Sequence, residues 1–296
     1  MNRNQLNLAL LALVAGLTLT VVLTQEEETP KTPLLALEPS AVERIAVRHP
    51  QAEEIVLERQ AGQWRLTAPG QAPAEAIEVS ALTDLAALKS ERQLAAADVD
   101  LAELGLSPPK YEIQLNDALL QFGGIEPLEH ERYVKVGETI HLISDPPSAA
   151  LDDDPADLVS KQLVPAGRQI VGLVLPDLQL HRGDGSGWTL SPPQAAVSAS
   201  ADQMQALVDG WSRARALWNQ SPDAGIDYQG KAEIQLQLDD GSQVDLVLVA
   251  RDPQLILAQP KARVHHHLSK ALADELLALP TLDDGEEPAA VEATES

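Results

Sequence analysis

A six-residue pattern that occurs twice constrains the fold of this chain more than any other feature. Lys110–Leu115 reads KYEIQL, and Lys231–Leu236 reads KAEIQL. A second pair lies upstream, where Trp64–Pro69 reads WRLTAP and Trp188–Pro193 reads WTLSPP. The two pairs keep their order and nearly the same spacing, which is the signature of a repeated structural unit. We therefore predict two similar modules in tandem.

Length and composition restrict the class of protein. With 296 residues, the chain has room for about two domains. Its formal net charge of −24 repels phosphate backbones, which argues against nucleic-acid binding. The chain has no cysteine. Disulfides, thiolate nucleophiles, cysteine-ligated zinc and iron–sulfur clusters are therefore excluded.

The N-terminal segment Leu6–Leu23 is apolar and uncharged. As a helix, it is about 27 Å long, close to the thickness of a hydrocarbon core. Arg3 precedes it and Glu26–Glu28 follow it, so the positive-inside rule places the N-terminus in the cytoplasm. We predict a single-pass membrane anchor, with the rest of the chain outside the cytoplasm. A cleaved signal peptide and a buried helix are the alternatives, although Val22–Gln25 lacks the small residues of a cleavage site.

The chain divides into six predicted segments, which together give an α+β fold class. Composition shifts and runs of proline and acid set the boundaries. The segments are an anchor (1–24), a tether (25–37), a first α+β module (38–144), a linker with a short helix (145–165), a second α+β module (166–280) and an acidic disordered tail (281–296).

In each module, alternating apolar and polar residues predict antiparallel strands around one helix. The first helix is expected at Ala74–Gln93, with Glu75, Glu78 and Asp84 facing water. The second is expected at Ala199–Asn219. Further helices are predicted from Asp154 to Leu163, with Asp154 as the N-cap, and at Ser269–Leu277. Strands are predicted near Ile45, Ile55 and Trp64, at Tyr111–Leu115, Leu119–Phe122, Arg132–Val136, Thr139–Ile143, Ile170–Leu175, Asp177–Arg182, Gly187–Leu190, Gln254–Ala258 and Arg263–His267, and as a hairpin that turns at Asp239–Ser242.

Three short patterns together resemble a bacterial family known as domain of unknown function 4340. The resemblance covers about Val42 to Leu277. The second module departs from the family pattern, because Gly225-Ile226 is not followed by a proline pair. The resemblance implies that the N-terminal anchor lies in a bacterial inner membrane with the rest of the chain in the periplasm. It also implies a partner among ABC-type transport systems of the gliding-motility kind, and it brings no catalytic residues. The patterns are Trp64-x-Leu66-x-x-Pro69, Leu101-x-x-x-Gly105-Leu106-x-x-Pro109 and Arg132-Tyr133-Val134.

Two clusters have metal-like composition. In a strand, His265 and His267 point to the same face and His266 to the other, so the outer two could share an ion. Asp252 or His181 is the candidate third ligand. The competing interpretation is an exposed strand end, which we favour. Asp152–Asp154 lacks the spacing of a calcium loop and is better explained as a solvated linker. We predict no metal site and no cofactor.

The four tryptophans are the remaining candidates for a binding surface. Trp64 and Trp188 hold equal places in the two modules, which favours buried core positions over a sugar or peptide platform. Trp211 and Trp218 lie seven positions apart on the expected second helix. Core or module–module packing is favoured for them, with an exposed partner or ligand groove as the alternative.

No catalytic motif is visible in the sequence. Gly183–Gly187 is glycine-rich but lacks the Lys-Ser/Thr and the following helix of a phosphate-binding loop, so we predict a hairpin turn. We do not expect an enzyme, although a carboxylate pair in a cleft would support a hydrolase. The expected function is an interaction or scaffold protein in an envelope transport complex. The alternative is a module that binds a glycan or peptide between the modules, near Trp211 and Trp218.

Overall fold

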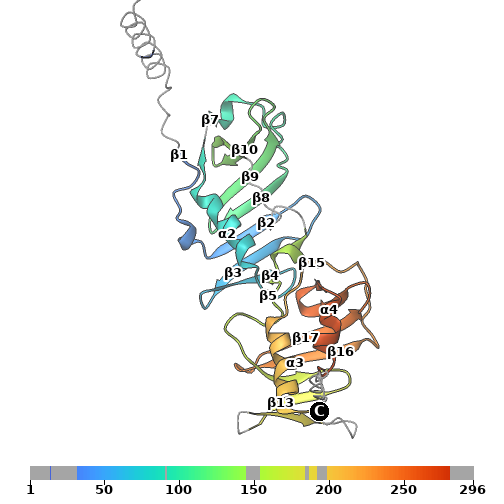
Figure 1. Ribbon diagram of the computed structural model, residues 1–296. Coiled ribbons are helices and arrows are strands. Elements are labelled where there is room, and N and C mark those ends of the chain that lie inside the picture. The colour runs from blue at the N-terminus through green and yellow to red at the C-terminus, as the bar shows by residue number, and fades with distance from the viewer. Residues whose placement is uncertain are drawn as a thin grey trace, which may run out of the picture.

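The computed structural model describes most of the chain between residues 32 and 280 (Figure 1). The predicted anchor at Leu6–Leu23 and the predicted tail at 281–296 lie outside the described residues. Among the residues that are described, no helix is both long and apolar enough to cross a membrane. The described ranges are 32–90, 92–144, 154–183, 187–191 and 199–280, with the isolated position 14.

Nine antiparallel strands form the first sheet, in the order β5-β4-β3-β2-β8-β9-β10-β11-β7. The predicted alternation is clear in β8, where Tyr111, Ile113 and Leu115 are buried and the residues between them are half-exposed. The strands are β2 (Arg44–Arg48), β3 (Ile55–Gln60), β4 (Gln63–Ala68), β5 (Ala72–Pro73), β7 (Arg92–Ala95), β8 (Tyr111–Leu115), β9 (Ala118–Ile125), β10 (Glu131–Val136) and β11 (Thr139–Ser144).

The helix of the first sheet is shorter than predicted. We expected it to run from Ala74 to Gln93, but α2 (Ala76–Asp84) ends at Asp84. After the 3-10 turn η2 (Leu85–Ala87), the chain becomes extended and forms β6 (Lys89–Ser90) and β7. Strand β7 pairs with β11 at the sheet edge, and β6 pairs with β1 (Thr32–Pro33) in a small separate sheet. Pairing with distant strands thus overrides the helical preference of this segment.

Eight antiparallel strands form the second sheet, in the order β14-β13-β12-β16-β17-β18-β19-β15. Two helices, α3 (Ala201–Arg213) and α4 (Ala271–Leu277), cover one of its faces (Figure 1). The described part of the chain therefore has an α+β fold with three antiparallel sheets and three α-helices. The strands are β12 (Ile170–Val174), β13 (Gln179–Arg182), β14 (Trp188–Ser191), β15 (Trp218–Gln220), β16 (Ala232–Leu238), β17 (Gln243–Ala250), β18 (Leu255–Gln259) and β19 (Val264–Leu268).

Two predicted helices of the second half are also corrected. We expected α3 to reach Asn219, but it ends at Arg213, and Trp218–Gln220 is the edge strand β15, which pairs with β19. The short helix at the linker was expected to reach Leu163. It is instead the 3-10 helix η5 (Pro155–Leu158). Asp154 caps it as predicted, because its side chain accepts a hydrogen bond from the Ala156 N–H.

The sequence repeat corresponds to a repeat of strand order. Without β5, the first sheet reads β4-β3-β2-β8-β9-β10-β11-β7, and each strand has a counterpart at the same place in the second sheet. The repeated patterns begin at the starts of β8 and β16, which are central in the two sheets. Trp64 pairs with Arg59 across β3 and β4, and Trp188 pairs with Arg182 across β13 and β14. The two tryptophans therefore occupy equivalent positions, as the sequence predicted.

The glycine of the family-like pattern has a structural role on the outer face of the first sheet. Gly105 has φ +67°, a conformation that glycine adopts without strain. Its position lets Leu106 pack with Ile140 in a small cluster on the face opposite α2. Both side chains are nearly fully buried. This pattern thus closes a second, minor core.

The two sheets lie end to end (Figure 1), and two residues from the end of the second sheet complete the core of the first. Ala262 and Val264, from the end of the second sheet, are buried within the hydrophobic cluster of the first. Gly70 lies so close to Ala262 that a Cβ on Gly70 would be 2.3 Å from the Ala262 carbonyl oxygen. Next to it, the Gln71 N–H donates to the Lys261 carbonyl at 3.0 Å. The junction is therefore a packed interface and not a flexible linker.

Candidate functional site

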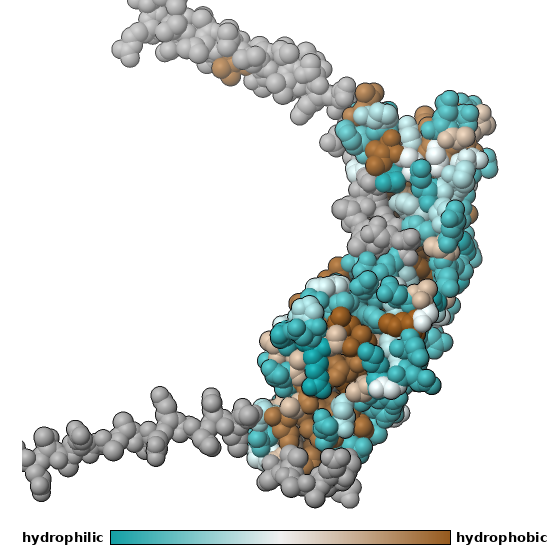
Figure 2. Space-filling view, turned by 90° about the vertical axis from the view of Figure 1, so that its right-hand side faces the viewer, coloured by the Kyte–Doolittle hydropathy of each residue, from teal (hydrophilic) through white to brown (hydrophobic). Residues whose placement is uncertain are grey.

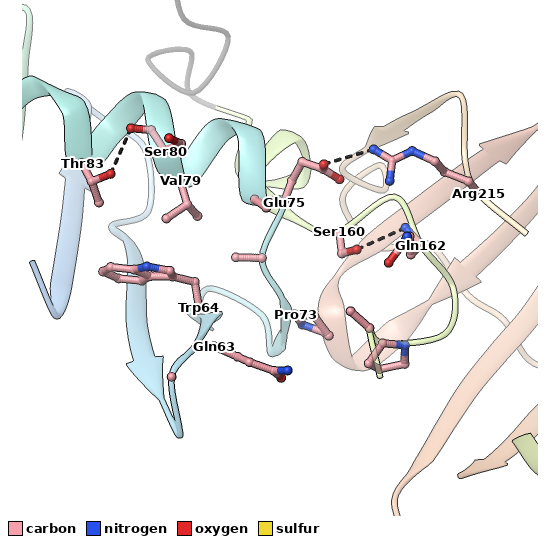
Figure 3. Close-up of a pocket in the computed structure, with 15 residues that line it drawn as sticks. Gln63, Trp64, Pro73, Glu75, Val79, Ser80, Thr83, Ser160, Gln162 and Arg215 are labelled. Carbon is pink, nitrogen blue, oxygen red and sulfur yellow. Dashed lines mark hydrogen bonds and ion pairs between the residues drawn. The ribbon is translucent and has the colours of Figure 1, made fainter. Parts of the chain in front are cut away.

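A pocket of about 520 Å³ lies at this junction, and we call it the junction pocket. Its volume falls in the range of small-molecule sites. Strand β4, the segment leading into α2, and the chain around Ser160–Ala166 form its walls, and Arg215 reaches it from the second half (Figure 3). The side chains used below are Gln63, Trp64, Glu75, Ser80, Gln162 and Arg215.

Glu75 is the best-anchored polar group of the pocket. Its side chain is only 7% exposed. One carboxylate oxygen accepts from Arg215 Nη2 at 3.1 Å and the other from the Lys161 N–H at 2.9 Å. We predicted that Glu75 faces water, and this is wrong, because the residue comes just before α2 at the point where the second half packs against it. Its two bonds satisfy a buried charge and tie the two halves together.

Trp64 forms an aromatic wall of the pocket. Figure 3 shows its indole ring below α2, near Val79. The ring was predicted to be buried, but Trp64 and Trp188 are both only half-buried. Both rings lie at the margin between sheet and helix. The Trp188 indole N–H donates to Gln205 Oε1 at 3.0 Å.

Trp211 and Trp218 do not form a common surface. Trp211 is fully buried in the second core, and its indole N–H donates to the Leu276 carbonyl at 2.8 Å. Trp218 lies on β15, is 42% exposed and stacks on His267 with ring centroids 5.0 Å apart. The predicted helical face that joins them is therefore absent, since only one of them lies in the helix. A ligand role for Trp218 alone stays a prediction.

The three consecutive histidines lie in β19, between β18 and β15, and not at an exposed strand end. His265 Nε2 lies 2.8 Å from the Tyr228 hydroxyl, on the face shared with His267. His266 points to the other face, where its Nδ1 lies 2.8 Å from Asn219 Oδ1. Within the described ranges, no three histidine, aspartate or glutamate side chains gather to hold a metal ion.

Burial controls the protonation of these histidines. It lowers the pKa of His266 from 6.5 to about 4, with smaller contributions from the charges of His265 and His267. The first sheet has a counterpart in His141, which is also buried and has a pKa lowered by desolvation. His141 pairs with Gln93 of the edge strand, as His266 pairs with Asn219. The repeat therefore extends to a buried histidine opposite an amide residue.

The other polar motifs have structural places. Asp154 accepts from the Ser221 hydroxyl as well as from its own helix, while Asp152 and Asp153 lie outside the described residues. Gly183–Gly187 joins the paired strands β13 and β14, and the Gly183 N–H donates to the Gly187 carbonyl at 2.9 Å. The paired strands confirm the predicted hairpin, while residues 184–186 of its turn lie outside the described residues.

The junction pocket was missed because residues far apart in the chain form it. Glu75 looked like an ordinary acid near a helix start, and Arg215 lay inside a segment predicted as helix. The one available signal was the place of Trp64 in the repeat. The comparison with protein families finds a match between residues 64–224 and the model of the Domain of unknown function (DUF4340). No curated protein and no solved structure matches the chain significantly.

Proposed function

Because this chain belongs to the DUF4340 family, whose name carries no activity, we propose its function from its geometry. We propose a membrane-anchored, extracytoplasmic interaction protein that acts as an accessory subunit of an envelope ABC-type transport or gliding-like complex. The anchor is Leu6–Leu23, the N-terminus is cytoplasmic, and the two tandem modules arose by duplication. The protein is not an enzyme in this proposal.

The packed junction is the observation that carries the proposal. Proteins that close on a substrate use a hinge between domains, where few contacts cross. Here Val264 completes the core of the first sheet, and the buried Glu75 bonds to Arg215. Because the junction is packed, the exposed surfaces of the two halves stay at a fixed distance from each other. Such rigidity suits a subunit that connects two partners.

Exposed apolar residues on the second half support the same function. Figure 2 shows hydrophobic residues gathered on the lower, C-terminal half, while the N-terminal half is mostly hydrophilic on this face. Leu217 is 57% exposed and Trp218 42%. Adjacent exposed apolar side chains of this size often mark protein contacts.

Membrane placement is testable because the chain contains no cysteine. We expect a single cysteine at the exposed hairpin residue Asp117 to react with a membrane-impermeant maleimide once the outer membrane is permeabilised. A cysteine at Asn2 is the matched control, and it should react only after the inner membrane is disrupted. Labelling of Asn2 and not Asp117 in intact inner membranes would contradict the proposed topology.

The interaction role is tested by photocrosslinking in living cells. A photoreactive amino acid at position 218 should give a specific crosslink to a membrane-transport component, identified by mass spectrometry. The same amino acid in place of Asp117, an exposed polar hairpin residue of the first half, is the control. Deletion of Leu6–Leu23 should abolish the product. The proposal fails if no position on the C-terminal half yields a discrete product while the protein is folded and abundant.

A second candidate function, an extracytoplasmic module that binds a glycan or peptide without catalysis, is favoured by the junction pocket. The pocket combines the half-buried Trp64 ring with several polar side chains. Its place between the two halves agrees with the cleft that this alternative requires, although Trp211 and Trp218 do not line it.

A further inference from the structure

We propose that the junction pocket binds one pyranose unit of a neutral saccharide, with the Trp64 indole as the surface on which the sugar ring stacks. This inference rests on the second candidate function, ligand binding, and needs neither the membrane anchor nor a protein partner. It follows from a difference between two equivalent tryptophans.

What each tryptophan ring contacts depends on one residue of the neighbouring helix. In the second sheet, Gln205 of α3 accepts a hydrogen bond from the Trp188 indole. The buried residues of the two helices have the same spacing, so Ser80 of α2 stands where Gln205 stands in α3. The buried residues that set this alignment are Val79, Leu82 and Thr83 in α2, and Met204, Leu207 and Val208 in α3.

The shorter side chain of Ser80 leaves room beside Trp64. A serine hydroxyl cannot extend as far as a glutamine amide, and within the described residues the Trp64 indole N–H has no hydrogen-bond partner. The room is the junction pocket, with a volume of about 520 Å³, and Trp64 and Ser80 both line it. The first half therefore has an aromatic ring with an unused donor at the place where the second half has a capped ring.

The other side chains of the pocket match a sugar. A pyranose has an apolar C–H face, which packs on an indole ring, and a rim of hydroxyl groups that donate and accept hydrogen bonds. Gln63 and Gln162 are exposed, so their amides are accessible to such hydroxyls. The Ser160 hydroxyl also lines the pocket, and Figure 3 shows it bonded to Gln162.

Charge favours a neutral ligand. The guanidinium of Arg215 is balanced by the Glu75 carboxylate 3.1 Å away. The chain as a whole carries −24, which repels anionic polymers at longer range. An acidic sugar would have to compete with Glu75 for Arg215, whereas a neutral sugar leaves this ion pair intact.

The test uses the purified full-length protein in detergent and isothermal titration calorimetry. The ligands are chito-, cello- and malto-oligosaccharides, with short uncharged peptides as a parallel panel. We expect saturable binding of at least one neutral saccharide. Trp64→Ala should weaken it about tenfold or more through loss of stacking. Trp188→Ala, at the equivalent position, should leave the affinity unchanged.

A second variant keeps the test decisive if Trp64→Ala folds poorly. Ser80→Gln should rebuild the cap that Gln205 provides for Trp188 and fill the pocket, so binding should be lost while the melting temperature does not fall. The proposal is overturned if the wild-type protein binds no neutral saccharide, if it binds only peptides, or if Ser80→Gln leaves saccharide binding intact. The crosslinking experiment can succeed in each of these cases, because it does not depend on the pocket.

Discussion

The carboxylate of Glu75 and the guanidinium of Arg215 meet at 3.1 Å across the junction, although 140 positions separate them in the chain. The pair is asymmetric, since the Glu75 side chain is 7% exposed and that of Arg215 46%. A buried acid with two partners fixes the geometry of the junction more strongly than an exposed pair does.

Removal of the buried acid should therefore loosen the junction. We expect Glu75→Ala to lower the free energy of unfolding by about 2–4 kcal/mol, because Arg215 and the Lys161 N–H both lose their acceptor. Arg168→Ala is the control. Arg168 forms a pair with Asp240 at the same 3.1 Å distance, but its acid is 29% exposed, against 7% for Glu75. Urea unfolding should show no measurable change for this control, and equal effects of the two substitutions would contradict the structural role of Glu75.

Close packing at Gly70 gives a second prediction. A Cβ at this position meets the Ala262 backbone, which cannot move aside as a flexible side chain can. Gly70→Ala should cost about 1–3 kcal/mol by overpacking. Gly187→Ala is the matched control, because none of the described residues lies within 4 Å of its Cβ position. Thermal melts of the two variants compare them directly, and a stable Gly70→Ala protein would mean that the two halves are not held this close.

The tryptophans should differ in their contribution to stability. Trp211→Ala should lower the free energy of unfolding by about 3–5 kcal/mol, because the ring is fully buried and its N–H bonds to Leu276. Trp218→Ala should cost much less, since that ring is 42% exposed. Chemical denaturation of both variants tests this order, and the reverse order would show that β15 and α3 are misassigned.

The buried His266 predicts a loss of stability in acid. Its pKa is about 4 in the folded protein and 6.5 unperturbed, so the unfolded chain binds the proton more readily. Its contribution is complete above about pH 6.5, decreases as the pH falls, and reaches a loss of about 3 kcal/mol below pH 4.

His266→Gln removes this titration and keeps a polar side chain opposite Asn219. The stability of the variant should depend less steeply on pH between 6.5 and 4 than that of the wild-type protein. Unfolding in urea across this pH range provides the measurement. Parallel pH profiles would show that His266 does not titrate with a lowered pKa.

Much of the sheet structure follows from the sequence, because a half-buried strand alternates its side chains. Strand β8 has the predicted bounds, Tyr111–Leu115. The edge strands β7 and β15 were missed for a physical reason. They are short, β7 consists of good helix formers, and β15 directly follows Ala214–Leu217, a segment that favours a helix. What makes them strands is pairing with β11 and β19, which local sequence does not encode.

The candidate site was less predictable than the fold. The repeat identified Trp64 and Trp188 as equivalent, but the difference between them lies in the helix residues Ser80 and Gln205. That difference becomes visible only when the two helices are aligned by their buried faces. Glu75 and Arg215 meet only because the two halves pack against each other at the junction. No local sequence pattern predicts this contact.

The presence of Ala262 and Val264 in the first core has a consequence for biosynthesis. A protein chain emerges from its N-terminus, and domains generally fold in that order. Here the N-terminal sheet lacks part of its interior until residues near the far end of the chain have been made. Until then, the apolar side chains of the first sheet that Ala262 and Val264 cover in the complete protein are exposed to solvent. We therefore expect a chain that ends before residue 262 to form a less stable first half than the complete chain does, because it lacks these two buried side chains.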